Sequence, residues 1–444
     1  MLIQSIAYLN DEQNKAVCKL SLAHRGIAWW KIGTGKTRIA LAWASLHCSD
    51  CSTKALVVCS PNAIRQWKDE ADICGFSRLK FLSYGELQTH RGDTAVWNTL
   101  ADDSLCCVII DELWMYKNVK TLRSKRVRIL STRLPTLGLS GSLVTARNIE
   151  DLFGQAYAVN INHALADNLT KFRTQFCVSA YNFGGLKFWA KEGALETIQQ
   201  RLAPYVDVYF PSAERESRLI PTVVDPTPQQ EEHLTSVNSE YFTILDSGEL
   251  EIKNAAVLVS KIQQISDGAV LDSQGTVSRI KSNKLTRTVE LCNQLIDAGE
   301  RVLIWVAFKA SLDLLHYSLG EETATLSSHT EFDFKGWNRG KYRICVATIG
   351  SGASLNDFTN VAYSIVYSAP YNHRAVQQAF GRTNRKGSQH KVAFYYMMQT
   401  DQTVDKSVYQ NLKLTASVET SIIATSAQVI QQYYKKINAS RSNP

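Results

Sequence analysis

The chain has 444 residues, with 45% hydrophobic and 20% charged positions and a formal net charge of +8. This length and composition predict an ordinary globular protein of two or three domains, and the mild positive charge is compatible with an anionic partner. No apolar run reaches about eighteen residues, and the N-terminal residues lack a basic segment followed by an apolar one. The sequence therefore argues against a membrane-spanning or secreted protein, and we expect it in the cytoplasm.

The first strong signal along the chain is "WWKIGTGKTRIALAWASL" over residues 29–46. The apolar "GIAWW" before the turn predicts a short buried strand, and the apolar positions from Ile39 to Leu46 predict a helix. Gly33 and Gly35 permit positive φ, so that consecutive backbone N–H groups can point inward beside the positive end of the helix dipole. The predicted strand, turn and helix are therefore suited to holding phosphate.

Within this turn, Lys36 is expected to reach the outer phosphates of ATP, and the Thr37 hydroxyl is expected to bind Mg²⁺. The predicted nucleotide-binding residues of the stretch are Gly33, Thr34, Gly35, Lys36, Thr37 and Arg38. Trp30 stands where the G-x-x-x-x-G-K-T pattern has its first glycine. A glycine-rich strand-to-helix turn with a surface lysine is therefore the alternative.

Ten cysteines are scattered along the chain. Cys48 and Cys51 have the spacing of zinc ligands, but no second C-x-x-C pair occurs in the sequence. Cys106 and Cys107 are adjacent, which does not suit a disulfide framework. We therefore expect reduced cysteines that serve as small apolar residues, without a zinc site.

Two further apolar runs, in "KALVVCSP" and "LCCVIIDELW", predict strands, and the second run ends in two acidic residues. A phosphate-binding turn requires a metal-holding acid at the end of a neighbouring strand. Asp111 would hold Mg²⁺, and Glu112 would orient and deprotonate the attacking water. Alternatively, the two acids only begin a helix, where its dipole favours negative charge.

The strand and helix patterns divide the chain into an α/β domain over 1–160, helical insertions and an interdomain connection over 161–285, a second α/β domain over 286–402, and a C-terminal helical brace over 403–444. The second series of strands begins at "RVLIWVAF" and continues through "YRICVAT" and "VAYSIVYSAP". Strands that alternate with helices predict a parallel sheet in each domain.

A basic segment, "AVQQAFGRTNRKGSQHKV", lies in the second half and contains Gln378, Arg382 and Arg385. The two arginines are three residues apart, so they would share one face of a short helix and repel each other unless an anion lies opposite. We expect them to stabilise the charge that develops on the γ-phosphate, and we place Gln378 in the nucleotide-binding set. A solvated basic turn or a direct nucleic-acid contact is the alternative.

Ordered segments along the chain resemble the motifs of one protein family. In the first half they are "LNDEQ", "WKIGTGKT", "VVCSPNAIRQWKDE", "LSYGEL", "IIDELWMYKN" and "LGLSGSLVTARNIEDLF". In the second half they are "SNKLTRTVELCNQLIDAGERVLIWVAF", "ATIGSGASLNDFTNV" and "QQAFGRTNRKGSQ". In this order they resemble the Swi/Snf family of double-stranded DNA translocases, within the superfamily-two helicases. One departure is Trp114, which replaces the histidine of the family's D-E-A-H motif.

The resemblance implies two tandem RecA-like domains that use ATP and Mg²⁺ to move along duplex DNA, with Gln13 as the reader of the adenine. Such translocases mostly touch phosphate, which Lys, Arg, hydroxyl and backbone groups bind without reading sequence. The candidate nucleic-acid contacts are Ser60, Asn62, Lys117, Asn118, Arg123, Arg126, Thr348 and Asn372. The basic segment that contains Lys117 and Arg126 could instead be a solvated helix face.

Two other functions are compatible with the same motifs. One is a helicase that separates strands of DNA or RNA with the same ATP site, and the other is a DNA-binding scaffold whose ATPase is uncoupled. We expect a monomer without membrane association, with room for a protein partner. The resemblance to compact family members implies a bacterial or phage-infected cell.

Overall fold

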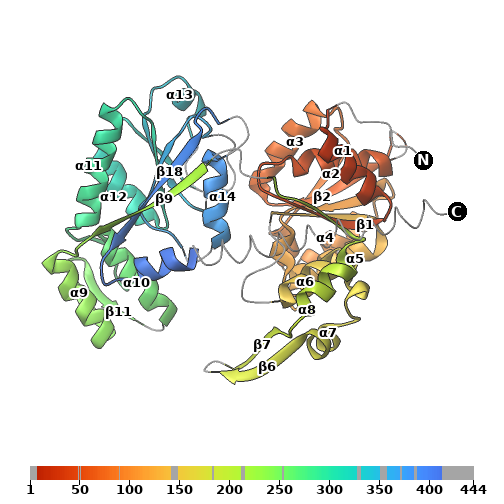
Figure 1. The fold of residues 1–444 in the computed structure, drawn as a ribbon, viewed down its shortest axis with the longest axis horizontal. Coiled ribbons are helices and arrows are strands. Elements are labelled where there is room, and N and C mark those ends of the chain that lie inside the picture. Colours follow the sequence, from red (N-terminus) through yellow and green to blue (C-terminus); the bar gives the residue numbers. More distant parts are fainter. Residues whose placement is uncertain are drawn as a thin grey trace. The chain divides into compact units, whose positions relative to one another are not determined.

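The computed structural model describes residues 8–48, 50, 52–89, 91–141, 149–182, 185–211, 216–252, 255–327, 332–350, 358–370, 373–384 and 388–412. The described chain divides into two compact units, the first ending at Pro211 and the second running from Ser212 to Leu414 (Figure 1). Among the described residues, the helices are all too short or too polar to cross a bilayer.

The first unit contains a six-stranded sheet whose paired strands all run parallel, in the order β3-β2-β4-β5-β1-β8. Its strands are β1 (Arg25–Trp30), β2 (Lys54–Cys59), β3 (Leu79–Ser83), β4 (Leu105–Ile110), β5 (Thr136–Ser140) and β8 (Val206–Tyr209). Its helices are α1 (Asp11–Ser21), α2 (Lys36–His47), α3 (Ile64–Ile73), α4 (Gly92–Leu100), α5 (Leu122–Arg133), α6 (Glu150–Ala158), α7 (Leu169–Phe176) and α8 (Ala194–Leu202).

Both faces of this sheet are covered, which explains why its strands read as nearly continuous apolar runs. Alternate residues of a strand point to opposite faces. Val57 and Ile109 therefore join an apolar cluster with residues of α1, α2 and α3, while Val58 and Ile110 join a second cluster with residues of α5 and α6. An antiparallel hairpin of β6 (Cys177–Asn182) and β7 (Gly185–Ala190) extends from this unit (Figure 1).

The second unit contains another six-stranded sheet with parallel pairing throughout, in the order β15-β16-β14-β17-β18-β9. Its strands are β9 (Glu216–Val224), β14 (Val302–Val306), β15 (Thr323–Leu326), β16 (Ile344–Thr348), β17 (Tyr363–Val366) and β18 (Val392–Thr400). Its helices are α9 (Pro228–Ser239), α10 (Ala255–Asp267), α11 (Asn283–Asp297), α12 (Lys309–Leu319), α13 (Phe334–Asn338), α14 (His373–Thr383) and a helix over 404–412. Two hairpins, β10 (Phe242–Leu245) with β11 (Gly248–Glu251) and β12 (Ala269–Leu271) with β13 (Val277–Arg279), complete it.

The predicted fold class, two tandem α/β domains with parallel sheets, is confirmed. The predicted segment over 161–285 differs, because the boundary between the units falls at Pro211 and the six-stranded sheet of each unit takes one strand from this segment. β8 pairs with β1, where Trp30 Nε1 donates to Asp207 Oδ2 at 2.6 Å, and β9 pairs with β18 over nine residues. β8 and β9 are edge strands with exposed or half-buried positions, so they lack the apolar runs of the central strands. Residues 413–444 of the predicted brace lie outside the described residues.

A fully buried lysine ties three helices of the second unit together. Lys284, in the first turn of α11, is 0% exposed, and its Nζ lies 2.9 Å from Asp267 Oδ1 and 2.8 Å from Asp405 Oδ2. Asp267 ends α10, and Asp405 lies in the helix over 404–412. The Ser311 hydroxyl of α12 also donates to Asp267 Oδ2 at 2.6 Å. Burial lowers the pKa of Lys284, but the two carboxylates outweigh burial, so the net pKa is raised and the lysine stays charged.

Candidate nucleotide site

The turn before α2 has the backbone conformation that the sequence predicts. Gly33 has φ 82° and Gly35 has φ 86°, both in the left-handed region that favours glycine, and α2 begins at Lys36. The Lys36 ammonium donates to Trp30 O at 3.0 Å and to Lys31 O at 3.2 Å. It therefore lies over the turn, at the N-terminal end of a twelve-residue helix whose dipole favours anions.

Gln13 contacts this turn directly. It closes a capping box at the start of α1 and is 5% exposed, and its Nε2 donates to Thr34 O at 3.1 Å. A Cβ on Gly35 would collide with Gln13 Nε2. The positive φ of Gly35 favours glycine there, and the close approach of Gln13 places the predicted adenine reader beside the predicted phosphate loop.

Asp111 follows the buried end of β4, and its carboxylate has two fixed donors. Trp67 Nε1 donates to Asp111 Oδ2 at 3.0 Å, and the Glu112 backbone N–H donates to Asp111 Oδ1 at 2.9 Å. Burial raises the pKa of Asp111, and these hydrogen bonds together with the Lys36 ammonium lower it in part. The Lys36 ammonium is therefore close enough to Asp111 to lower its pKa, so the turn and the end of β4 lie at the same edge of the sheet.

The strand that carries these acids is not a direct neighbour of the strand before the turn, contrary to the prediction. β5 lies between β1 and β4 in the sheet. A Cβ on Gly141, directly after β5, would lie 2.9 Å from Ile32 Cγ1 and 4.0 Å from Lys36 Nζ. The end of β5 therefore lies between the turn and the two acids. Glycine at position 141 leaves space there, because it has no side chain that would approach Ile32 and Lys36.

Glu112 has a strained backbone and a held side chain. Its φ is 44°, in the left-handed region that is uncommon for a residue other than glycine. Trp114 Nε1 donates to Glu112 Oε2 at 2.5 Å. The residue that replaces the histidine of the family motif therefore fixes the carboxylate of the predicted general base.

Thr37 and Arg38 are the remaining predicted nucleotide-binding residues of the turn. Both are half-buried in the first turn of α2. The Arg38 guanidinium forms an ion pair with Glu70 of α3, and the hydrogen bond to Glu70 raises the pKa of Arg38. This pairing links α2 to α3 and engages the side chain predicted to contact nucleotide.

The second unit places Gln378 and Arg382 four residues apart on α14, and both are half-buried. Residues i and i+4 of a helix lie on one face, so these two side chains are neighbours. α14 ends at Thr383, and Arg385 lies outside the described residues together with Asn372. The prediction that Arg382 and Arg385 share a helical face therefore stays a prediction.

The nucleic-acid candidates of the first unit include exposed and half-buried positions. Lys117 and Asn118 are exposed and directly follow a 3₁₀ turn over Leu113–Tyr116, and Lys117 Nζ lies 3.5 Å from Asp151 Oδ2. Arg123 is half-buried, with its guanidinium 6.0 Å from the centre of the Tyr116 ring. Ser60 is half-buried after β2, and the Asn62 side chain lies outside the described part. In the second unit, Thr348 is half-buried at the end of β16.

Arg126 corrects one of these predictions, because its side chain is buried and structural. It is 3% exposed, and its guanidinium donates to Asp93 Oδ1 at 2.8 Å and to Asp93 Oδ2 at 3.1 Å. Its Nη1 also donates to Leu87 O at 2.9 Å and Thr89 O at 2.8 Å. Arg126 therefore anchors α5 to α4 and to the segment before α4, and it is removed from the nucleic-acid set.

The cysteines correct a second prediction. Cys48, at the end of α2, is joined in a disulfide to Cys106 in β4, with Cα atoms 5.8 Å apart. Cys107 lies beside this pair. The two segments are 58 residues apart in sequence, so their proximity is a property of the sheet and not of the C-x-x-C spacing.

Two aromatic residues, Trp67 and Tyr84, hydrogen-bond to Asp111, and the predicted set of site residues contains neither of them. Trp67 binds the Asp111 carboxylate, and the Tyr84 hydroxyl donates to Asp111 O at 2.7 Å. Both residues belong to quoted motifs, "VVCSPNAIRQWKDE" and "LSYGEL". The motifs signalled that these positions matter, but the contact with Asp111 depends on the order of the strands.

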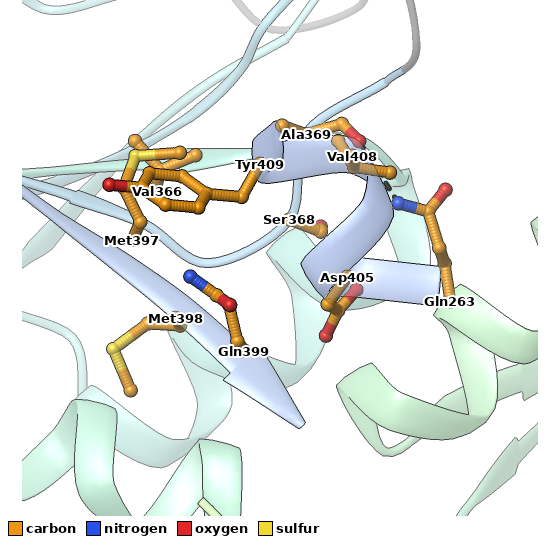
Figure 2. A pocket seen from close by; sticks show the side chains of 10 residues that line it. All are labelled: Gln263, Val366, Ser368, Ala369, Met397, Met398, Gln399, Asp405, Val408 and Tyr409. Carbon is orange, nitrogen blue, oxygen red and sulfur yellow. Dashed lines mark hydrogen bonds between the residues drawn. The ribbon is translucent and has the colours of Figure 1, made fainter. Parts of the chain in front are cut away.

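A cavity lies in the second unit, where β17 and β18 end beside the helix over 404–412 (Figure 2). The space open to the centre of a water molecule is about 10 Å³, enough for about one water. Gln399 lines it and is 5% exposed, and its Nε2 has no hydrogen-bond partner among the described residues. The cavity is far too small for a nucleotide, so it is not the nucleotide site.

Comparison with known proteins identifies one part of the chain. Residues 283–387 match the family model of the helicase conserved C-terminal domain. No curated protein matches the chain. One similar solved structure is the Sulfolobus solfataricus SWI2/SNF2 ATPase core in complex with dsDNA, with 18% sequence identity, 97% of this chain and 95% of that chain covered, and a TM-score of 0.39. The match to the family model confirms the helicase resemblance of the second unit from the start of α11 to the segment after α14.

Proposed function

We propose that this protein is a DNA-dependent ATPase that couples ATP hydrolysis to translocation on double-stranded DNA. The observation that carries the proposal is the convergence of the left-handed glycine turn, Lys36 and Asp111 in the first unit. This arrangement combines a phosphate-binding turn with an acid that is suited to a metal ion. The helicase match over residues 283–387 supports a motor of the helicase class.

The residues of the first unit are assigned by their chemistry. Backbone N–H groups of the turn and the Lys36 ammonium bind the phosphates of ATP, and Gln13 contacts the adenine. The Thr37 hydroxyl and the Asp111 carboxylate are hard oxygen ligands of the kind that Mg²⁺ prefers, so the donor set fits this ion. When bound, Mg²⁺ neutralises charge on the phosphates. Glu112, held by Trp114, orients the attacking water and accepts its proton.

The second unit supplies positive charge. We assign Arg382 and Arg385 to the stabilisation of charge that develops on the γ-phosphate, a role worth on the order of 10³ to 10⁵ in turnover in related chemistry. Gln378, one helical turn before Arg382, is assigned to nucleotide contact. Lys36 belongs to the first unit and the two arginines belong to the second, so in this assignment hydrolysis depends on both units.

DNA binding is assigned to dispersed phosphate contacts. The proposed residues are Ser60, Asn62, Lys117, Asn118, Arg123, Thr348 and Asn372. Lys117 and Asn118 are exposed after the 3₁₀ turn that follows Glu112. These two proposed DNA contacts are therefore close in sequence to the proposed catalytic acid. The Swi/Snf resemblance of the ordered motifs favours duplex over single strands.

The test is ATP turnover of the full chain without nucleic acid, with single-stranded DNA, with duplex DNA and with RNA, at one fixed salt concentration. We expect duplex DNA to give the largest stimulation and Lys36→Ala to abolish it. Lys171→Ala is the matched control, because Lys171 is exposed on α7 and pairs only locally with Asp167. Turnover that no nucleic acid changes, or that survives Lys36→Ala, would refute the proposal. Stimulation by single strands or RNA alone would favour the strand-separating helicase.

A further inference from the structure

Three cysteines of the first unit gather at the end of α2. Cys48 directly follows this helix, where its backbone N–H donates to Ala44 O at 2.9 Å, and it is 3% exposed. Cys106 and Cys107 are consecutive residues of β4. The three sulfur atoms all lie within 4.8 Å of one another. The fold therefore builds a cluster that the sequence spacing of these cysteines does not indicate.

A register shift in the sheet turns both strand cysteines to the same face. Consecutive residues of β2 pair with Leu105 and Cys107, so Cys106 is an extra residue in β4. Neighbouring side chains of a regular strand point to opposite faces, and a bulge removes this alternation. Accordingly, Cys106 and Cys107 both pack in the apolar cluster that contains Cys48, whereas Leu105 belongs to the cluster on the other face.

The disulfide between Cys48 and Cys106 uses only two of the three sulfurs. Cys107 Sγ lies 3.8 Å from Cys106 Sγ. Two ligand sulfurs around a tetrahedral zinc ion, with Zn–S bonds of about 2.3 Å, are also about 3.8 Å apart. A disulfide needs neither the bulge nor a third sulfur, whereas a cluster of soft thiolates selects thiophilic ions such as Zn²⁺.

We propose that Cys48, Cys106 and Cys107 bind one Zn²⁺ ion when the Cys48–Cys106 disulfide is reduced. Reduction transfers two electrons and two protons from a dithiol, which is itself oxidised to a disulfide. Each of the three thiols then releases a proton as it coordinates the ion, which leaves one tetrahedral position for another donor. Cys51 follows Cys48 by three residues but lies outside the described residues.

The ion would join the far ends of the two elements that carry the nucleotide-site residues. α2 begins at Lys36 and ends beside Cys48, and β4 contains Cys106 and Cys107 and ends just before Asp111. Zinc at the cysteine end would therefore fix the position of the helix relative to the strand and stabilise the first unit. The metal site does not depend on the proposed ATPase activity.

The test uses the full chain, reduced with a dithiol, loaded with Zn²⁺ and dialysed against metal-free buffer. We expect about one zinc per chain by elemental analysis, and in the Co²⁺-loaded chain the charge-transfer and d–d absorption bands of tetrahedral thiolate coordination. Cys107→Ser keeps both disulfide partners but should lose the ion. Cys292→Ser is the matched control, because Cys292 is also buried but lies in α11 of the second unit.

A readout on the unmodified chain keeps the test independent of how the variants fold. Bound zinc should slow alkylation of Cys48, Cys106 and Cys107, mapped by peptide mass, and should leave Cys292 unaffected. Absence of stoichiometric zinc or cobalt in the reduced chain would overturn the proposal, as would zinc binding that Cys107→Ser leaves unchanged. Equal alkylation rates with and without zinc would overturn it as well. A Cys48–Cys106 disulfide that persists in excess dithiol would show a structural disulfide instead.

Discussion

Glu112 is held in an uncommon backbone conformation at the end of β4, and its carboxylate accepts a hydrogen bond from Trp114. A left-handed conformation costs a residue other than glycine on the order of 1–2 kcal/mol, so the surrounding contacts must stabilise it. The indole of Trp114 is one such contact. It also lowers the freedom of the carboxylate that we assign to water activation.

Trp114→Phe is therefore expected to reduce DNA-stimulated ATP turnover while ATP still binds. The substitution keeps an aromatic ring but removes the N–H donor, and a hydrogen bond to a charged group contributes about 1.5–3 kcal/mol. Turnover should fall by roughly ten-fold or more, measured as steady-state phosphate release. Trp97→Phe is the control, because Trp97 is 53% exposed on α4. Equal turnover in the two variants would contradict a role for the Trp114 hydrogen bond.

Arg126 and Lys125 give opposite predictions although they are adjacent. Arg126 is buried and binds Asp93 and two backbone carbonyls, whereas Lys125 is exposed on α5. Arg126→Ala should lower the free energy of unfolding by about 1–3 kcal/mol, because it leaves buried acceptors unpaired. Denaturant unfolding followed by circular dichroism measures this change. Lys125→Ala should leave the unfolding midpoint unchanged, and a larger loss in Lys125→Ala than in Arg126→Ala would refute the assignment.

Arg126 and Lys125 also show that the sequence does not predict which basic side chain of a helix is buried. The basic residues over 117–128 are alike in sequence as candidate phosphate contacts, but Asp93 lies 33 residues before Arg126 and on another helix. Which arginine turns inward depends on that partner, and no local pattern encodes it. Gly33 and Gly35, by contrast, are local: their positive φ and the start of the helix at Lys36 follow from the turn itself, and the structure has this conformation. The binding of phosphate by Lys36 stays a prediction.

At the scale of elements, the buried Lys284 network holds α10, α11 and the helix over 404–412 together. Lys284→Met should destabilise the second unit by about 3–5 kcal/mol, because removal of one partner leaves buried carboxylates without their counter-charge. Thermal unfolding of the full chain measures the effect. Lys281→Met is the control, because Lys281 is exposed just before α11. A second-unit transition that Lys284→Met does not shift would contradict the structural role of the network.

The same network predicts a pH dependence whose sign follows from the raised pKa of Lys284. A raised pKa in the folded state means that folding favours the protonated lysine, so the stability is fully present below the unfolded pKa of about 10.4. It is lost as the pH rises through the folded pKa. The stability difference between the natural chain and Lys284→Met should therefore shrink at strongly alkaline pH. A difference that grows with alkaline pH would contradict this assignment.

Six strands with apolar runs were predicted from sequence, whereas the interior strands β5 and β18 and the edge strands were not. β1, β2, β4, β14, β16 and β17 coincide with the quoted runs. β8 and β9 were missed because half-exposed edge strands lack that signal. The bulge at Cys106 is invisible in sequence for another reason, since it depends on the register between β2 and β4.

At the scale of the whole molecule, the net charge of +8 and the dispersed basic residues favour DNA binding through phosphate. Affinity for duplex DNA should fall steeply with salt, by on the order of 10³ between about 50 and 200 mM if about six phosphates are contacted. Lys117→Ala should reduce the slope of log affinity against log salt by about one, and Arg126→Ala should leave it unchanged. Fluorescence anisotropy over a salt series measures both slopes. A flat salt dependence would contradict phosphate-based binding.

For the two-unit architecture, the sequence predicts the order of strands and helices but not the boundary between the units. Parallel α/β order in both halves follows from strands that alternate with helices, and it is confirmed. The boundary at Pro211 was not predictable from composition, because the chain near it changes sheets without a long linker. The participation of Arg382 and Arg385 in a site with Lys36 stays a proposal that kinetics must test.

The most direct measurement is displacement of a third strand from a DNA triplex by the full chain with ATP. A motor that moves along duplex DNA should remove the triplex-forming strand and leave the underlying duplex intact, and Glu112→Gln, which lacks the proposed base, should not remove it. ATP hydrolysis stimulated by duplex DNA without any triplex displacement would contradict translocation. Separation of the duplex strands in the same assay would contradict it in favour of a strand-separating helicase.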